Sequence, residues 1–367
     1  MAKRIANTTL NASTIDILNV IRGNSSYSYQ QSVPVVKDRH DIPVVGEVIY
    51  GTPAFANEFI HSLLNRIALV RIKSATFNNP YRDLKKGYIE VGETIEEIFV
   101  DIAKVRLFKK ETDADVVKEE FRRTIPDVKA AFHAINWRVK YPITIEDEEL
   151  RFAFTSIDGV TDMISRIVDA MYRASEYDEF LLFKYMLIKG FNDNDIKKSE
   201  LANGATLTEY ATEFRGLSNE MLFLNTKYNS YGVRNNCPRE RQRIFMDARF
   251  NAKFDVEVLA SAFNMGKADF LSRLTLIDNF TSFDNERFAE ISEESNCIKE
   301  VTAEELTAME KVKAIIVDEE WFQVYDNLTK FTEHYVGSSL YWNYWLHNWK
   351  TVSWSPFANA VAICEGV

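Results

Sequence analysis

Two periodicities of apolar positions run along this chain, and they predict its longest helix and its longest strands. The helical one extends from Ser156 to Lys189, where apolar side chains recur at three- and four-residue spacing with one polar exception, Asp178. Ser156 suits the start of a helix, and Gly190 is expected just past its end. A helix of this length would span roughly 50 Å, well beyond the average of about 11 to 12 residues. We therefore predict a single long spine helix.

A period of two predicts a pair of strands in the first half of the chain. Apolar side chains occupy alternate positions over residues 98–103 and again over residues 135–141. The segment between them includes KKETDADVVKEEFRR, which is dense in charge. We predict a protruding ribbon from about Gly92 to Tyr141. Because an isolated ribbon is barely stable in water, a neighbouring subunit is expected to cover its apolar stripe.

The N-terminal segment has a weaker pattern. Ser13 or Thr14 suits the start of a short helix that ends at Gly23. Residues 24–53 are rich in polar and turn residues and hold three prolines, so they read as a linker, a targeting tail or an extended arm. After the N-terminal segment, the pattern predicts a helix over residues 55–64 and a strand over 67–72. Beyond the spine helix it predicts a connector over 191–204, then a helix that begins with a capping box at 206–209, and then a basic loop over 234–243 that leads into a strand. The remaining predicted elements are a helix-turn-helix over 255–273, an acidic loop over 280–296, and a strand, turn and strand over 314–328.

Near the C-terminus, residues 339–363 hold four of the six tryptophans. A platform for sugars or bases would need one exposed aromatic face with polar residues around it. Here both strand faces are largely apolar, which favours a strand inside a sheet that is covered on both sides. We therefore predict a central core strand, broken at Pro356 and resumed from Phe357 to Ile363. The tryptophans assigned to this core strand are Trp345, Trp349 and Trp354.

Composition narrows the class of protein. The 367 residues are 46% hydrophobic and 13% aromatic, enough for a large core. A formal charge of -10 argues against a protein that coats nucleic acid or anionic membrane. The three cysteines, Cys237, Cys297 and Cys364, are odd in number and widely spaced along the chain. They suggest a reducing compartment and no disulfide framework. The chain starts without the apolar core of a signal peptide, and no apolar run is long enough to predict a membrane span.

Candidate chemistry is sparse. The run EDEE at 146–149 could supply paired carboxylates for glycoside hydrolysis, but its place before a helix favours a role at the helix N-terminus. The five histidines lack metal-ligand spacing, and no phosphate loop, nucleophile elbow or dinucleotide fingerprint is present in the sequence. The helix-turn-helix offers only Lys267 and Arg273 as cations in its second helix, so a packed corner is favoured over DNA reading. The arginines of the basic loop could touch phosphate, although a solvated loop or a subunit contact is the commoner meaning. We predict no catalytic, metal or cofactor site.

Four blocks, in order along the chain, carry a family resemblance. They are RIALVRIKSATFNNPYRDLKKGYIEVGETIEEIFVDIAK at 66–104, FDVEVLASAFNMGKADFL at 254–271, VDEEWFQVYDNL at 317–328 and LYWNYWLHNWKTVSWSPFANAVA at 340–362. Together they are similar to the major capsid proteins of phi29-like short-tailed bacteriophages. The resemblance implies the α+β capsid fold of the Hong Kong 97 type. Its expected parts are an N-terminal arm (1–50), a peripheral domain (51–91 and 142–200, with the spine helix), an E-loop ribbon (92–141), an axial domain (201–328) and return strands (329–367), with no C-terminal immunoglobulin-like domain.

The resemblance also implies a structural function. Such a protein self-assembles as pentamers and hexamers into an icosahedral or prolate head shell around double-stranded DNA, with a scaffolding protein and a portal or connector as partners. It would be made in the host bacterial cytoplasm and reside in the virion, without membrane or cofactor. The acidic balance is consistent with DNA held without sequence specificity, since many phosphate contacts would bind strongly. The alternatives are a phage enzyme or tail-associated carbohydrate-binding protein, and a DNA-binding regulator. The E-loop residues expected to contact a neighbouring subunit are Ile98, Val100, Ile102, Lys109, Lys110, Arg122 and Arg123.

Overall fold

The computed structural model describes residues 14–71, 79–105, 123–148, 159–254, 274–295 and 297–366, without the side chains of residues 63–71, 159–169 and 254. The chain divides into two compact units, and each is described by itself below. The first unit comprises Met1–Asn79, Val139–Glu179 and Thr329–Asn348. The second unit comprises Pro80–Arg138, Phe180–Leu328 and Trp349–Val367.

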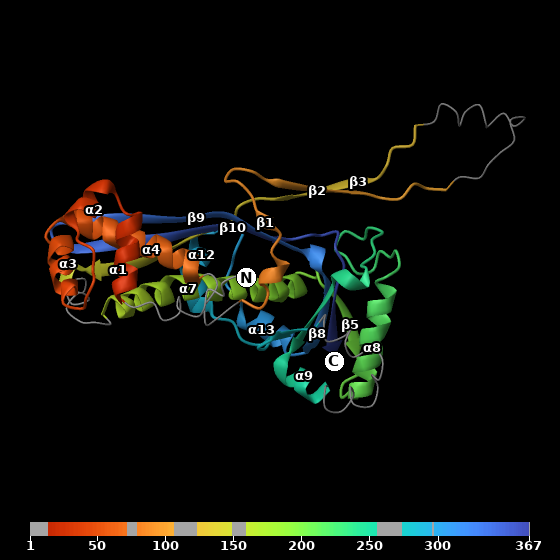
Figure 1. The fold of residues 1–367 in the computed structure, drawn as a ribbon. Coiled ribbons are helices and arrows are strands. Elements are labelled where there is room, and N and C mark those ends of the chain that lie inside the picture. The colour runs from red at the N-terminus through yellow and green to blue at the C-terminus, as the bar shows by residue number, and fades with distance from the viewer. Residues whose placement is uncertain are drawn as a thin grey trace, which may run out of the picture. The chain divides into compact units, whose positions relative to one another are not determined.

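Helices form the N-terminal part of the first unit (Figure 1). The segment predicted as a linker, tail or extended arm instead contains two helices, and the strand predicted over residues 67–72 is wrong because a helix continues through Arg71. Side chains of the first helix hold the following segment in place: the Asn19 amide exchanges two hydrogen bonds with the backbone of Val36, and Arg22 donates to the carbonyl of Val33. The four helices are α1 (Thr14–Asn24), α2 (Tyr27–Ser32), α3 (Asp41–Tyr50) and α4 (Pro53–Arg71).

A four-stranded sheet has the strand order β1-β9-β10-β4. Its central strand β10 carries the tryptophans, as predicted from the apolar pattern. One face of β10, with Trp342 and Tyr344, is buried in the first unit against α1, α3 and α4. The other face is half-exposed, so Trp345 and Trp349 are less buried than predicted, as is Trp354 near the strand end. The strands are β1 (Gly87–Tyr88), β4 (Trp137–Glu146), β9 (Phe322–Val336) and β10 (Tyr341–Trp354).

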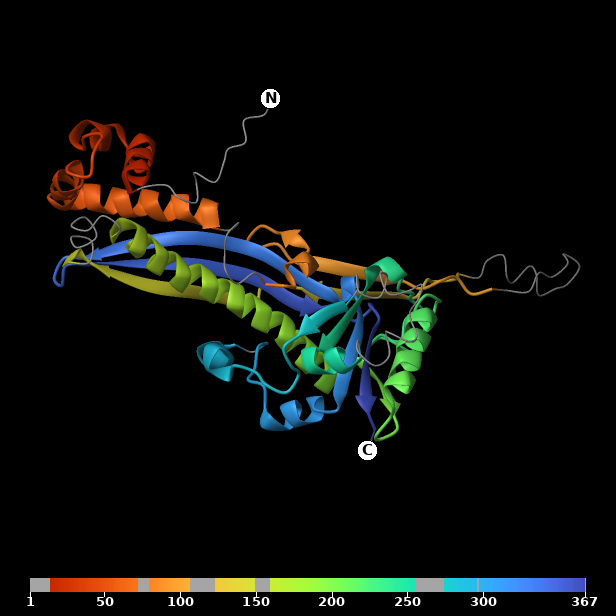
Figure 2. The ribbon, with the colours of Figure 1, turned by 60° about the horizontal axis from the view of Figure 1, so that its bottom comes forward.

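A five-stranded sheet forms the core of the second unit, with the order β5-β11-β8-β6-β7. Its central strands are buried on both faces, which explains their nearly continuous apolar runs. Helix α8 (Leu207–Glu220) covers one face and opens with the predicted capping box of Thr206 and Glu209 (Figure 2). On the other side, Phe245 packs against the rings of Tyr81 and Phe322. The strands are β5 (Lys197–Leu201), β6 (Gln242–Asp247), β7 (Leu274–Ile277), β8 (Val312–Asp318) and β11 (Ala360–Glu365).

The predicted spine helix exists as α7 (Gly159–Asn192). Ser156 lies outside the described residues. Gly190 lies inside this helix rather than past its end, and the reason is a close approach: a Cβ there would stand 2.9 Å from the Trp321 ring. The middle of α7 is buried within the first unit. Its C-terminal turns, including Phe183 and Leu187, are buried within the second unit.

A separate two-stranded ribbon is formed by β2 (Ile95–Val100) and β3 (Val128–His133) (Figure 1). The ribbon was predicted, but its second strand was misplaced. The alternating segment 135–141 belongs to β4 in the four-stranded sheet, where Trp137 is buried. Residues 128–133 pair with β2 instead. The alternation over 135–141 is that of a sheet strand with one covered face, which is the same pattern that a ribbon strand shows.

Short elements complete the described part of the chain. The predicted connector over 191–204 contains β5, and the predicted acidic loop over 280–296 contains helical turns. The predicted helix-turn-helix lies outside the described residues. No described helix is both long and apolar enough to span a membrane. Cys237 and Cys364 are buried thiols and Cys297 is exposed. The short elements are η2 (Arg82–Leu84), η3 (Arg239–Arg241), α9 (Ala248–Phe254), η5 (Asn285–Phe288), α12 (Ala289–Glu294), α13 (Ala303–Met309) and η6 (Glu319–Trp321).

Candidate assembly surface

The β2–β3 ribbon has one apolar face that points to solvent. Cross-strand pairs such as Ile98 with Ala130 and Val100 with Val128 place these side chains together. We call this surface the apolar ribbon face. The large side chains on it are exposed by 58% (Ile98), 57% (Val100), 54% (Ile102), 51% (Val128) and 69% (Phe132). Monomeric proteins rarely gather exposed apolar side chains in this way, so the face indicates a binding surface.

The opposite face of the ribbon packs on other segments of the second unit, to which the ribbon itself belongs. Phe99 stacks on Phe357 with ring centroids 5.6 Å apart. Asp101 forms an ion pair of 3.0 Å with Arg234, and the Lys129 ammonium donates to the carbonyl of Tyr231. One face is thus occupied by contacts within the chain while the other stays open.

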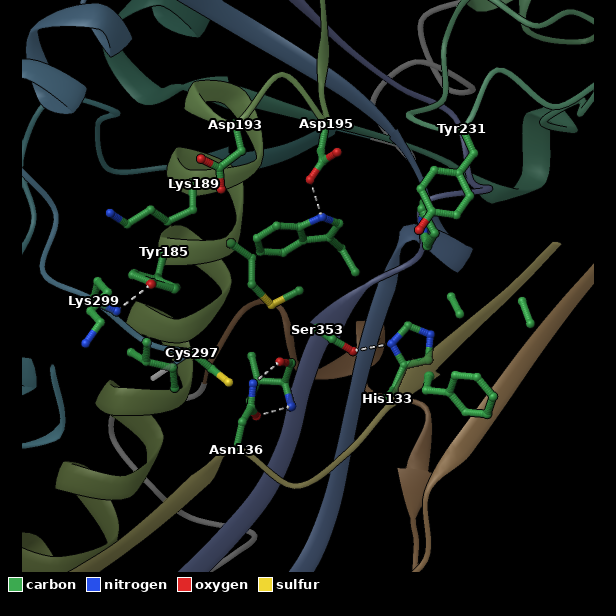
Figure 3. A pocket seen from close by; sticks show the side chains of 18 residues that line it. His133, Asn136, Tyr185, Lys189, Asp193, Asp195, Tyr231, Cys297, Lys299 and Ser353 are labelled. Atoms are coloured by element: carbon green, nitrogen blue, oxygen red, sulfur yellow. Dashed lines mark hydrogen bonds between the residues drawn. The ribbon is translucent and has the colours of Figure 1, made fainter. Parts of the chain in front are cut away.

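A buried polar network anchors the root of the ribbon. The Glu97 carboxylate accepts a hydrogen bond of 2.7 Å from the Ser355 hydroxyl and lies 3.3 Å from Nε2 of His133. Nδ1 of His133 is 2.7 Å from the Ser353 hydroxyl (Figure 3). Ser355 is 0% exposed and His133 is 4% exposed, so both polar groups depend on these partners. The network fixes the orientation of the apolar ribbon face relative to the rest of the second unit.

The predicted E-loop contacts fall partly on this surface. Ile98, Val100 and Ile102 share the apolar ribbon face, and Arg123 is exposed. Lys109, Lys110 and Arg122 lie outside the described residues. Sequence reasoning missed Val128 and Phe132. The signal was present, because Val128, Ala130 and Phe132 alternate with Lys129, Ala131 and His133, but two alanines weakened the contrast.

Two tryptophans of β10, Trp349 and Trp354, contact other side chains of the same chain. The Arg138 guanidinium lies over the Trp349 ring, 5.2 Å from its centroid. The Trp354 ring stacks on Trp321 at 5.6 Å, and its Nε1 donates to Asp195. Rings covered in this way offer little free face to a sugar or a base. These contacts weigh against a carbohydrate-binding platform.

Arginines of the predicted basic loop are paired with carboxylates of the same chain. Arg234 contacts Asp101 as described, Arg241 lies 2.9 Å from the fully buried Asp318, and Arg243 lies 2.8 Å from Asp83. Arg239 instead donates to the amide oxygen of Asn219. Burial raises the pKa of Asp318, and its hydrogen bonds and Arg241 oppose that rise. The loop is therefore tied to the second unit by its own charges, and these arginines are not a free phosphate-binding cluster.

A cavity of about 770 Å³ lies in the second unit, between the end of α7 and the ribbon root (Figure 3). Its polar side chains mostly bond to one another or to nearby groups: Lys189 pairs with Glu305 at 2.7 Å, and Asn136 exchanges two hydrogen bonds with the backbone of Val352. Burial and then the neighbouring Asp195 raise the pKa of Asp193. Among the described residues, no three His, Cys, Asp or Glu side chains gather as a metal site.

The fold is that of phage capsid proteins, of the Hong Kong 97 type. A chain in the capsid structure of Staphylococcus phage Andhra superposes with a TM-score of 0.59 at 14% identity, over 80% of this chain and 86% of that one. The family can be stated more narrowly. The model of the Phi29-like phage major capsid protein family matches residues 18–364, and the chain belongs to this family.

Individual relatives agree with this assignment. The chain is 36% identical to the major capsid protein of Bacillus phage PZA over 359 residues, which are 96% of this chain and 73% of the relative. It is 35% identical to that of Bacillus phage B103, with the same coverage of 96% and 73%. The predicted family, fold class and role as a head shell protein are confirmed. No enzyme family is indicated by these matches.

Proposed function

We propose that this chain builds the head shell of a short-tailed phage by packing its apolar ribbon face against a second copy of itself. The exposed side chains of that face carry the proposal. A shell made of one kind of subunit must supply both halves of each contact from the same chain. An apolar surface held in a fixed direction by the buried network of Glu97, His133 and Ser355 suits this requirement.

The free energy gained when one apolar ribbon face is buried favours assembly of many copies over isolated pairs. Complete burial of a Val, Ile or Phe side chain contributes about 1.5–3 kcal/mol. The five large side chains of the apolar ribbon face are between 51% and 69% exposed, so covering them adds on the order of 5 kcal/mol. Association itself costs about 4–15 kcal/mol. One ribbon contact is therefore close to break-even, and copies that each give and receive a ribbon hold together cooperatively.

The finer parts of the proposal concern organisation and partners. The copies form pentamers and hexamers of an icosahedral or prolate shell, with a scaffolding protein and a portal or connector during assembly. The shell encloses double-stranded DNA without reading its sequence, and the protein is structural rather than enzymatic. The pairing of Arg234, Arg241 and Arg243 within the chain supports weak DNA contact, since phosphate binding depends on free cations. Synthesis takes place in the host bacterial cytoplasm.

The test replaces the stripe Ile98, Val100 and Ile102 together with serine. We expect soluble subunits with an unchanged thermal midpoint, because these side chains are already exposed. Shells, counted by electron microscopy with the scaffolding protein present, should be lost. A matched control replaces Val35 and Val44 with serine as well. These side chains are exposed by 49% and 54%, and the control should assemble normally. Normal shells from the triple variant would refute the ribbon contact, and a wild-type chain that never forms shells would refute the proposed function itself.

A further inference from the structure

Three buried oxygen atoms in the first unit lie on neighbouring side chains and have no protein partner. They are Oδ1 of Asn57 on α4, Oε2 of Glu333 on β9 and the hydroxyl oxygen of Tyr344 on β10. Each is shielded from solvent and forms no hydrogen bond within the described part of the chain. Buried polar atoms are bonded in the great majority of cases, so these three indicate a missing partner.

The three side chains meet on one face of the four-stranded sheet. The Asn57 amide donates to the other carboxylate oxygen of Glu333, Oε1, at 2.9 Å. A hairpin joins β9 to β10, and near its turn the Tyr335 ring packs on Trp342 with centroids 4.6 Å apart. Side chains of an antiparallel pair share a face at every second position, so Glu333 lies opposite Tyr344, two residues further along each strand.

Negative charge gathers around these atoms. Burial raises the pKa of Tyr344, and the carboxylates of Glu333 and Asp147 raise it further, so both acids lie within electrostatic reach of its hydroxyl. The Asp147 carboxylate also accepts a hydrogen bond of 3.2 Å from the Tyr335 hydroxyl. Neither acid forms an ion pair with a Lys, Arg or His of the described residues. A carboxylate oxygen shielded from water favours a positive charge beside it, since removing an ion from water without a counter-ion is costly.

We propose that Glu333, Asn57 and Tyr344 bind a hard divalent cation, Ca²⁺ or Mg²⁺. Carboxylate, amide and hydroxyl oxygens are the ligands that such ions prefer. The ion ties helix α4 to the β9–β10 hairpin and takes its remaining ligands from water, while Asp147 adds charge nearby. Sequence spacing could not predict this site, because its three ligands are brought together only by the fold. The proposal does not depend on shell formation, since it concerns the folded subunit.

The first test measures the thermal midpoint of the subunit in EDTA and then in increasing Ca²⁺ or Mg²⁺ at constant ionic strength. A ligand that binds only the folded chain raises this midpoint as its concentration increases, and we expect that rise for the wild type. Glu333→Gln keeps an acceptor for the Asn57 amide but removes the charge, so it should weaken cation affinity by at least about tenfold. Glu146→Gln is the matched control and should keep the rise, because Glu146 is exposed and lies on the opposite face of β4 from the buried Ile145.

The second test detects the bound ion directly with Tb³⁺, which occupies oxygen sites of this kind. Tb³⁺ bound next to Tyr344 and Trp342 should emit under ultraviolet excitation, because the rings transfer energy to it. The emission should saturate at a single ion per subunit, decrease as Ca²⁺ or Mg²⁺ displaces the probe, and be lost in Glu333→Gln. Tyr344→Phe removes a neutral ligand and should weaken binding less than Glu333→Gln does.

Two results would overturn the proposal. One is a thermal midpoint of the wild type that does not change with Ca²⁺ or Mg²⁺ at constant ionic strength. The other is a midpoint rise or Tb³⁺ emission that Glu333→Gln leaves intact. In either case a buried water, which can donate to two of the three oxygens and accept from the Tyr344 hydroxyl, would be the occupant instead.

Discussion

Glu97 is the residue whose loss should free the ribbon without unfolding the protein. Glu97→Ala removes the acceptor of the Ser355 hydroxyl and the carboxylate beside His133, and these two groups are 0% and 4% exposed. Each group keeps one other partner, because Nδ1 of His133 stays beside the Ser353 hydroxyl and the Ser355 hydroxyl still accepts from the backbone N–H of Phe357. The change therefore removes two hydrogen bonds, which contribute about 0.5–1.5 kcal/mol each and about 1–3 kcal/mol together. The whole stability of a domain is only about 5–15 kcal/mol.

The cost should appear at the ribbon, because the apolar ribbon face contributes little to the core. Hydrogen exchange of the amides in β2 and β3 measures this directly, as faster exchange with a nearly unchanged global thermal midpoint. Glu97→Gln retains an acceptor for Ser355 and should cost less. Glu96→Ala is the control, since Glu96 is exposed on the same strand. If the ribbon amides of Glu97→Ala stay as protected as those of the wild type, the polar network does not anchor the ribbon.

Two further predictions concern β10 and its neighbours. Trp349→Ala should lower the free energy of unfolding by about 1–3 kcal/mol, because the Trp349 ring is half-buried and covered by Arg138. A fully buried Trp typically contributes more, about 3–5 kcal/mol. A loss of soluble folded protein would contradict this prediction. Burial raises the pKa of Asp326, but Lys350 and Lys85 outweigh it and hold this pKa below its ordinary value, so the ion-pair stabilisation is present above about pH 4 and is lost as the pH falls through the folded pKa. Asp326→Asn removes the carboxylate that pairs with Lys350 at 3.0 Å and also with Lys85, so it should lower the free energy of unfolding by about 1–3 kcal/mol at pH 7. Thermal midpoints measured against pH should converge with the wild type in acid, and a constant difference would refute the linkage.

Elements whose signal is local were predicted well. The apolar spacing of α7, the capping box at Thr206 and the strand, turn and strand around Trp321 each depend on residues close in sequence. Elements whose stability comes from distant partners were missed. The segment that follows α2 is held by hydrogen bonds from Asn19 and Arg22 of α1, and no periodicity within that segment predicts these partners. Helix α3 does have an apolar spacing, with Ile42 and Ile49 buried, but Pro43 and the surrounding turn residues outweighed it in the prediction.

For the same reason, only one of the two strands of the apolar ribbon face was predicted from the sequence. Alternation identified the stripe of Ile98 and Val100, but it could not tell which later strand pairs with them, because β3 and β4 both alternate. The burial of the tryptophans was overestimated because alternation reports whether a face is apolar and not what covers it.

The three cysteines differ in burial, so a thiol reagent should modify only one of them in the folded chain. Burial raises the pKa of Cys364 to about 11, and burial likewise raises the pKa of Cys237 well above its ordinary value. Both thiols therefore stay protonated and shielded at neutral pH, and a thiolate is the form that alkylating reagents attack. Cys297 is exposed. A maleimide dye would thus attach once per native subunit, and the fluorescence of a single labelled particle, divided by that of one subunit, would count the copies in it.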